Sequence, residues 1–349
     1  MNKGNSEFFK VLSKEYSKYI PVYCTGYPES QFIENYVNKY QIYPDKNDIV
    51  LNGKNFSIIK QMGFDAISIW DYRKAKGGYY LKDNLRVDGW GRIYRGNWYM
   101  WDGVFKNSEI IDNWNHLNLP SFKDLCYLKE FLKKVKNQID VVISLPGLFE
   151  KTWQSMGFIF FSKCIRHQNY DFIQKISDFF SEYLKKLVLT LQKFGVNMFL
   201  IADDCGYKNR EFIPKTLWKQ FFFQNYLDIT NMIHKKNHKS ILHSDGYISN
   251  FIDLFIDLGF DAIQSLEPSA GVDIFTLFKQ YRNKICFIGN LDITFLIYGN
   301  PYEIKKYIIK LITKAKEANS LLIISPTQQI NSAIKLENIK MMIDTTKSA

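Results

Sequence analysis

One histidine of the chain lies close to an acidic residue in a pattern that could bind a metal ion or move a proton. In the segment ILHSDG, a short apolar run ends in His243, and Asp245 follows two residues later. Residues two apart on an extended chain point to the same side, so both side chains can face one pocket. Imidazole and carboxylate bind zinc or harder divalent ions, and imidazole titrates near neutral pH. We predict a catalytic role for His243 and a metal site formed by His243 and Asp245.

Other acidic side chains also follow short apolar runs. Asp71 ends FDAISIWD, and Asp203 and Asp204 end VNMFLIADD. Neighbouring residues point to opposite sides of an extended chain, so one of this pair would face the pocket and the other would cap the next loop. We predict catalytic roles for Asp71 and Asp204. The predicted substrate-binding residues are Asp203, Glu267, Asn290, Trp90 and Gln328.

Acidic groups that converge on one pocket could raise each other's pKa, hold a cation or bind a cationic substrate. The alternative is that each aspartate only caps the helix after its strand, and this alternative applies most directly to Asp273 and Asp292. A lone histidine, likewise, is commonly a hydrogen-bonded structural group. Cys205 could be a reactive thiol or simply a small loop residue.

Eight short apolar runs, rich in β-branched residues, alternate with segments of helical spacing. This alternation predicts a parallel sheet whose strands are buried on both faces. An open, doubly wound sheet would need a glycine-rich phosphate turn, and neither GxGxxG nor a P-loop is present. We predict an α/β fold, a (β/α)8 TIM barrel, as one domain over residues 1–349. The expected strand ends around its mouth are Gly26, Asp71, Pro146, Asp203, His243, Glu267, Asn290 and Ser325.

Residues 72–118 interrupt this alternation after the second strand and contain four tryptophans. The segment is too long for a simple turn, so it is an inserted β-hairpin or a lid. Tryptophan-rich loops commonly form small cores of their own, but this loop leaves a strand at the predicted active edge. We predict that it covers part of the mouth and brings Trp90, Trp98 or Trp101 near the pocket.

The net charge of +11 is spread along the chain without a run of five or more basic residues, so nucleic-acid binding is not predicted. Five cysteines without a CxxC pair favour a reducing compartment over a disulfide scaffold. The N-terminus lacks the apolar core of a signal peptide, and no apolar run reaches the length of a membrane span. We expect a cytoplasmic protein that does not enter a membrane.

The chain resembles the uroporphyrinogen decarboxylase superfamily from about residue 20 to residue 343. The resemblance is carried by FDAISIWD, GWGRIYR, LPGLFEKTWQSMGF, FLIADDCGY, ILHSDG, LGFDAIQSLEP, KICFIGNLD and IISPTQQI. The superfamily includes the decarboxylase and the zinc methyltransferases that move methyl groups between small methylated substrates, corrinoid proteins and coenzyme M. The resemblance implies a (β/α)8 barrel.

Several positions depart from the family pattern. The arginine-rich segment after the first strand of the decarboxylase is replaced by CTGYPES, so uroporphyrinogen is not the expected substrate. Asp71 matches the family's pyrrole-binding aspartate, but Trp153 stands at its tyrosine position. Cys205 lies near its serine position, and Thr327 or Gln328 replaces its late histidine.

The zinc methyltransferases use an HxC pair and a second cysteine after the last strand, which here read His243–Ser244–Asp245 and Gln328. The loss of both thiolates predicts a weak zinc site or a preference for a harder divalent ion. The resemblance implies a methyltransferase that passes a methyl group from a small substrate to a corrinoid protein. The alternatives are a decarboxylase of a different substrate and a barrel that binds a ligand without catalysis.

Overall fold

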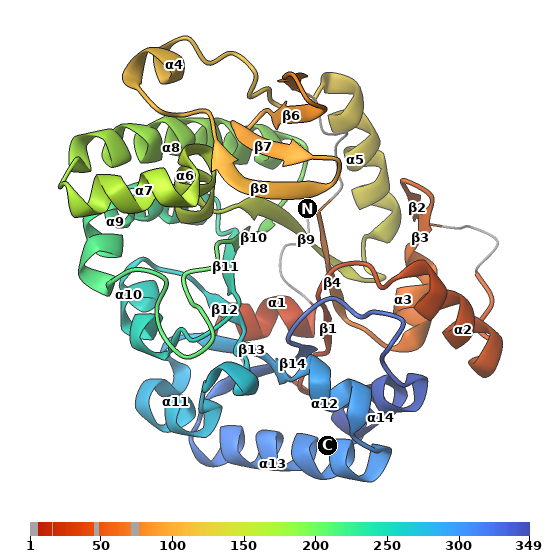
Figure 1. Ribbon diagram of the computed structural model, residues 1–349. Helices are drawn as coiled ribbons and strands as arrows, with labels where there is room; N and C mark the ends of the chain where they lie inside the picture. The colour runs from red at the N-terminus through yellow and green to blue at the C-terminus, as the bar shows by residue number, and fades with distance from the viewer. Residues whose placement is uncertain (1–5, 16, 45–48, 71–76) are drawn as a thin grey trace.

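A computed structural model describes residues 6–15, 17–44, 49–70 and 77–349. Its central element is a sheet of eight parallel strands that are hydrogen-bonded in chain order (Figure 1). The strands are β1 (Tyr23–Cys24), β4 (Ala66–Ile69), β9 (Asp140–Pro146), β10 (Met198–Ala202), β11 (Lys239–Ser244), β12 (Ala262–Ser265), β13 (Cys286–Leu291) and β14 (Leu321–Pro326). A parallel bridge between Val22 and Ile324 joins the two edge strands. The predicted (β/α)8 barrel is therefore confirmed.

Helices surround the strands on the outside of the barrel (Figure 1). They are α2 (Ser30–Tyr40), α3 (Phe56–Met62), α5 (Phe122–Val135), α6 (Leu148–Met156), α7 (Phe158–Arg166), α8 (Tyr170–Lys193), α9 (Lys215–His234), α10 (Ile252–Asp257), α11 (Ile274–Tyr281), α12 (Ile293–Tyr298), α13 (Pro301–Glu317) and α14 (Leu336–Ser348). Short 3₁₀ turns occupy Ser249–Phe251, Pro268–Ala270 and Arg282–Lys284, and β2 (Val50–Leu51) pairs with β3 (Lys54–Asn55). In the described residues, no helix is long and apolar enough to cross a membrane.

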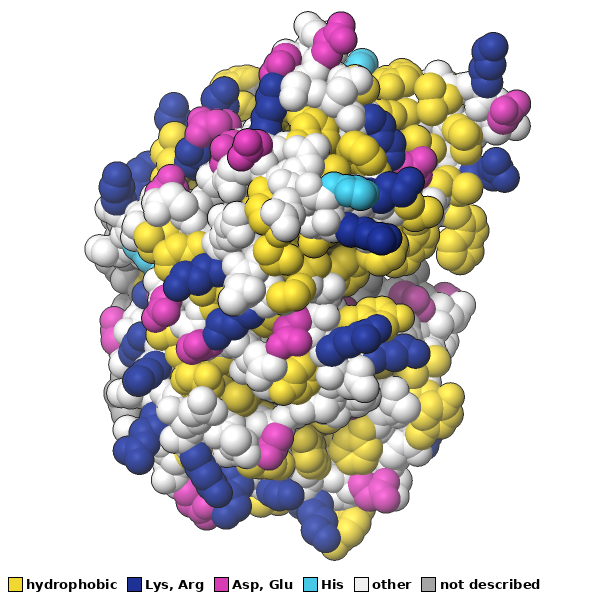
Figure 2. All heavy atoms as spheres, turned by 60° about the vertical axis from the view of Figure 1, so that its left-hand side comes forward, with side chains coloured by type: hydrophobic (Ala, Val, Ile, Leu, Met, Phe, Trp, Pro, Cys, Tyr) yellow, Lys and Arg dark blue, Asp and Glu magenta, His cyan; other side chains and the backbone are white. Residues whose placement is uncertain are grey.

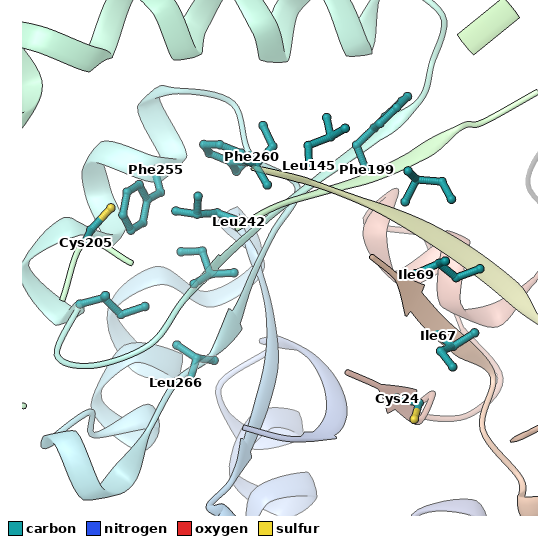
Figure 3. Packing of buried hydrophobic residues seen from close by; sticks show 14 of the residues in the cluster. Cys24, Ile67, Ile69, Leu145, Phe199, Cys205, Leu242, Phe255, Phe260 and Leu266 are labelled. Atoms are coloured by element: carbon teal, nitrogen blue, oxygen red, sulfur yellow. The ribbon is translucent and has the colours of Figure 1, made fainter. Parts of the chain in front are cut away.

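The alternating side chains of the strands divide the core into two parts. On β10, Leu200 belongs to the core inside the barrel, whereas Phe199 packs in the layer between sheet and helices. Figure 3 shows this outer layer around Leu242, where Phe255 and Phe260 lie 6.4 Å apart. The first helix, α1 (Glu7–Leu12), adds its apolar side chains to the inner core. The polar site must therefore lie at the other end of the strands.

The insertion is a four-stranded antiparallel sheet followed by a short helix. Its elements are β5 (Gly78–Tyr80), β6 (Leu85–Asp88), β7 (Arg92–Arg95), β8 (Trp98–Gly103) and α4 (Ser108–Asp112). It packs on α6: the amide of Phe105 donates to Ser155 O at 2.9 Å, and Asp102 forms a bridge with Gly157. The insertion predicted as a β-hairpin or a lid is thus a separate small sheet. On the face shown in Figure 2, Lys and Arg side chains are dispersed among acidic and apolar ones.

Candidate functional site

Three of the predicted site residues meet where β10 and β11 end. Potential ligand atoms of Asp204, His243 and Asp245 all lie within 4.8 Å of one another. The pairing of Ala202 with His243 aligns the two strand ends, and the amide of Asp245 donates to Asp204 Oδ1 at 2.9 Å. His243 Nε2 is 3.7 Å from Asp245 Oδ1. We call these three residues the strand-end cluster.

The buried side chain of Gln264 sets the orientation of the His243 ring. Gln264 Nε2 donates to Thr25 Oγ1 and to Thr327 O, each at 3.1 Å, which leaves its Oε1 facing His243 Nδ1. Because an amide oxygen only accepts, the network assigns the proton to Nδ1 and directs Nε2 towards Asp245. This arrangement is typical of histidines that bind metals, in which a second residue fixes the tautomer.

The electrostatics of the cluster are dominated by burial among like charges. Burial raises the pKa of Asp204 and of Asp245, and it outweighs the opposing effect of His243. Burial lowers the pKa of His243, but the charges of Asp245, Asp204 and Glu150 and the hydrogen bond to Gln264 together raise it by more. Asp245 Oδ1 is buried and has no hydrogen-bond partner among the described residues. A cation would therefore relieve both the repulsion and the unpaired oxygen.

Asp203 anchors the start of α6. Its Oδ2 accepts from Phe149 N at 3.0 Å and from Tyr226 Oη at 2.5 Å, and its Oδ1 accepts from Glu150 N at 2.7 Å. The side chain is fully buried. Both oxygens hold the first turn of α6, whose free amides favour an acidic partner, and a substrate-binding role for Asp203 stays a prediction. The expected split of the Asp203–Asp204 pair is observed, since only Asp204 joins the cluster.

The family model for uroporphyrinogen decarboxylase (URO-D) matches residues 157–349, a little over half of the chain. The chain belongs to the URO-D family. A search of curated proteins found no match. Among solved structures, a methyltransferase from Methanosarcina mazei is 16% identical, with 98% of this chain and 97% of that chain covered and a TM-score of 0.71. This likeness shows the shared fold.

Two further solved structures are B12-independent methionine synthases. One, a putative synthase from Listeria monocytogenes, is 13% identical, with 95% of this chain and 99% of that chain covered and a TM-score of 0.47. The other, from Shewanella sp. W3-18-1, is 14% identical, with 84% of this chain and 86% of that chain covered and a TM-score of 0.46.

The HxC pair described in the sequence analysis reads His243–Ser244–Asp245 in this chain. The Asp245 carboxylate therefore lies in the strand-end cluster at the position of the cysteine. Ser244, between the two ligand positions, is buried, and its Oγ accepts from Cys205 N at 2.9 Å. Cys205 itself is buried, its thiol donates to Asp203 O at 3.3 Å, and burial raises its pKa. A buried thiol of this kind is inert, in agreement with the structural alternative.

Glu267 and Gln328 lie together beside the cluster. Gln328 Nε2 donates to Glu267 Oε1 at 2.9 Å, and Glu267 Oε2 accepts from Gly246 N at 2.8 Å. The charge of Glu267 also raises the pKa of Asp245. Both residues are therefore placed at the edge of the site, and their substrate-binding role stays a prediction.

Two other predicted substrate-binding residues point elsewhere. Asn290 is almost fully buried; it donates to Leu266 O at 2.7 Å and accepts from Tyr307 Oη at 2.6 Å, so it links the sheet to α13. Trp90 packs against Phe180 and Tyr183 of α8, with ring centroids 5.7 and 5.3 Å apart. These contacts give Asn290 and Trp90 structural partners, and their substrate-binding roles stay predictions.

Asp273 and Asp292 cap helices. Asp273 accepts from Phe275 N at 3.0 Å, and Asp292 accepts from Thr294 N at 2.8 Å, so each caps the helix that follows it. The capping alternative therefore holds for both. Asp71 lies outside the described residues.

Two site residues were not predicted from the sequence. Trp70 is 43% exposed, and its ring lies 6.2 Å from that of His243 at an angle of 83°. It also lines a cavity of about 300 Å³ together with Tyr27 and Phe56. Glu150, on the first turn of α6, is close enough for its charge to raise the pKa of His243. A larger cavity of about 620 Å³, lined in part by Lys215, does not include the cluster.

The insertion packs Trp101 against α6. Trp101 has a φ of 54°, which is unusual for a large side chain, and its ring stacks on Trp153 of α6 at 5.5 Å. Trp98 is 82% exposed. A direct role of Trp98 or Trp101 in substrate binding stays a prediction.

Proposed function

We propose that this URO-D family protein is an enzyme that moves a methyl group from a small methylated substrate to an acceptor. The observation that carries the proposal is the convergence of Asp204, His243 and Asp245 at the ends of adjacent barrel strands. In barrels of this kind the chemistry is located at that edge. Membership of the URO-D family and the fold shared with a methyltransferase from Methanosarcina mazei are consistent with this reaction class.

The donor set suits a divalent metal ion. One imidazole and two carboxylates provide three ligands, and Asp245 Oδ1, which has no hydrogen-bond partner among the described residues, is available to bind the ion. Gln264 keeps His243 Nε2 free of its proton when the ring is neutral. Because no thiolate is present, the set favours zinc less than a site with cysteines does and suits manganese or magnesium better. When bound, the ion would act as a Lewis acid towards the heteroatom that loses the methyl group.

The chain itself would orient the substrate and stabilise the leaving group. The bond between the methyl carbon and the substrate heteroatom breaks, and its electron pair stays on the heteroatom. The new bond to the methyl carbon uses an electron pair from the acceptor, for which we propose a reduced corrinoid carried by a partner protein. Without a bound ion, His243 in its protonated form can instead donate a hydrogen bond from Nε2 to the developing negative charge. Trp70 would provide an apolar wall beside it.

Two measurements test this proposal. Protein purified without chelators should bind about one divalent ion, by elemental analysis and Mn²⁺ titration. His243→Ala should abolish this binding, whereas Cys205→Ala should leave it unchanged, because the thiol is buried away from the ligand atoms. Methylated thiols, ethers and amines should then be screened for methyl transfer to reduced cobalamin, followed by its absorbance. Absence of transfer from all three classes, in metal-loaded protein, would contradict the proposal.

A further inference from the structure

The insertion is connected to the site by a chain of polar side chains that crosses from β7 to α6. Arg92 on β7 is held by Asp88: its Nε donates to Asp88 Oδ2 at 2.8 Å, and its Nη2 lies 2.7 Å from the same oxygen. The remaining nitrogen, Nη1, donates to Gln154 Oε1 at 3.1 Å. Gln154 Nε2 then donates to Glu150 Oε1 at 2.8 Å. Arg92 therefore reaches Glu150 through one amide.

The orientation of the Gln154 amide is fixed by its surroundings. Lys151 Nζ, which is buried, donates to Gln154 Oε1 at 2.8 Å from the other side. Two cationic donors on one oxygen exclude the flipped amide, since an NH₂ group there would face both of them. The only orientation that satisfies all partners points Nε2 at Glu150. Tyr99 of β8 adds a hydrogen bond from its hydroxyl to Gln154 O at 2.9 Å.

Glu150 is also fixed at its backbone next to the strand-end cluster. Its amide donates to Asp203 Oδ1, and Asp203 directly precedes the cluster residue Asp204. The carboxylate of Glu150 affects the pKa of Asp245 and of His243, so its field reaches the point where the ligand atoms converge. Glu150 lies outside the group whose atoms are all within 4.8 Å of one another. It is thus placed to stabilise a bound cation through its charge rather than to ligate it directly.

We propose that Glu150 is a fourth acidic residue of the cation site and that Gln154 and Arg92 are positioning residues that hold it there. The insertion would then help to position a residue of the cation site, in addition to packing on α6. This inference rests on the cation site proposed above. Because Glu150 would act through its charge, removing that charge should weaken the binding of a cation at the strand-end cluster.

In the alternative, the insertion only packs on α6. The two hypotheses then predict opposite changes in cation affinity for Arg92→Gln. Arg92→Gln removes a positive charge near the site, and by electrostatics alone this change leaves cation affinity unchanged or increases it. If Arg92 positions Glu150, the same change releases Gln154 and lowers cation affinity. Arg95, at the exposed end of the same strand, provides a matched control, because Arg95→Gln makes the same change in charge without the hydrogen bond.

The experiment is a calorimetric titration of the full-length protein with Mn²⁺ at fixed ionic strength. We expect the Kd of Glu150→Gln and of Gln154→Leu to rise at least tenfold, and that of Arg92→Gln to rise severalfold, with Arg95→Gln unchanged. The Glu150→Gln/Gln154→Leu double variant should bind no more weakly than Glu150→Gln alone, because both changes disable the same carboxylate. Arg92→Lys retains the charge but lacks the planar guanidinium that bonds Asp88 and Gln154 at fixed positions. It should also bind Mn²⁺ more weakly, and it replaces Arg92→Gln in the test if that variant does not fold.

Three results would overturn the inference while leaving the cation site intact. These are an unchanged Kd in Glu150→Gln, tighter binding in Arg92→Gln, and additive losses in the double variant. In each case His243→Ala would still lose the ion. If the wild-type protein binds no Mn²⁺ and no Zn²⁺, the inference and the proposed metal site fall together. Thermal unfolding of each variant, followed by circular dichroism, shows that the change in Kd occurs in folded protein.

Discussion

The role of Asp203 as the anchor of α6 leads to a quantitative prediction for Asp203→Ala. The substitution removes three hydrogen bonds, to Phe149 N, Glu150 N and Tyr226 Oη, from a fully buried site. At about 1 kcal/mol for each bond, with a further cost for the amides left without partners, the loss in unfolding free energy is about 4 kcal/mol. Asp228→Ala, on the exposed face of α9, is the matched control and should change the free energy by less than about 0.5 kcal/mol.

The effect should depend on pH in a defined direction. Burial, followed by the charge of Glu150, raises the pKa of Asp203 from 3.8 to about 7. A carboxyl group whose pKa is raised on folding stabilises the fold below its unfolded pKa, and this stabilisation is lost as the pH rises through the folded pKa. The difference between wild type and Asp203→Ala should therefore shrink from about 4 kcal/mol at pH 5 to less than about half of that at pH 8.

Urea unfolding at both pH values, followed by tryptophan fluorescence, measures these differences. A loss below about 1 kcal/mol at pH 5 would refute the assignment of Asp203 as an anchor. A difference that grows with pH would instead mean that the folded state favours the ionised carboxylate, held by the amides of α6. Either result would leave the strand-end cluster untouched, because Asp203 contributes none of its ligand atoms.

Three other predictions concern the site directly. Gln264→Leu should weaken Mn²⁺ binding about tenfold without loss of the fold, because His243 loses the acceptor that fixes its tautomer; calorimetry checks this, and unchanged affinity would contradict it. Trp101→Leu should reduce substrate affinity more than Trp98→Leu, since Trp101 stacks on Trp153 of α6 whereas Trp98 is 82% exposed. Equal effects in a binding titration would contradict a role of Trp101 in the pocket. Uroporphyrinogen should not be decarboxylated at an enzymatic rate, because the segment CTGYPES offers no arginine to its carboxylates; formation of coproporphyrinogen, measured by porphyrin fluorescence, would show the opposite.

The fold could be predicted from the sequence because each strand carries its own local signal. A short apolar run that ends in a polar residue, repeated eight times between helical segments, fits few architectures. The insertion was recognisable by its length and its tryptophans, but its four strands were not. Pairing in a small antiparallel sheet depends on turns and cross-strand contacts that single-strand patterns do not reveal. Its attachment to α6 through Arg92 and Gln154 had no sequence signal at all.

Site residues could be predicted from the sequence where they lie on extended strands, because side-chain direction then follows from the alternation of the strand. The alternation does not hold where the backbone leaves the extended conformation. His243 and Asp245 share a side because they are two apart, and Asp204 separates from Asp203 because adjacent residues alternate. Asn290 breaks this rule because its φ is 68°, a left-handed conformation that asparagine tolerates, and its side chain turns outward to Tyr307. Glu150 escaped notice for a related reason: an acidic residue in the first turn of a helix normally complements the helix dipole. The hydrogen bond from Gln154 to Glu150, with Gln154 oriented by Arg92 and Lys151, becomes visible only in the three-dimensional arrangement.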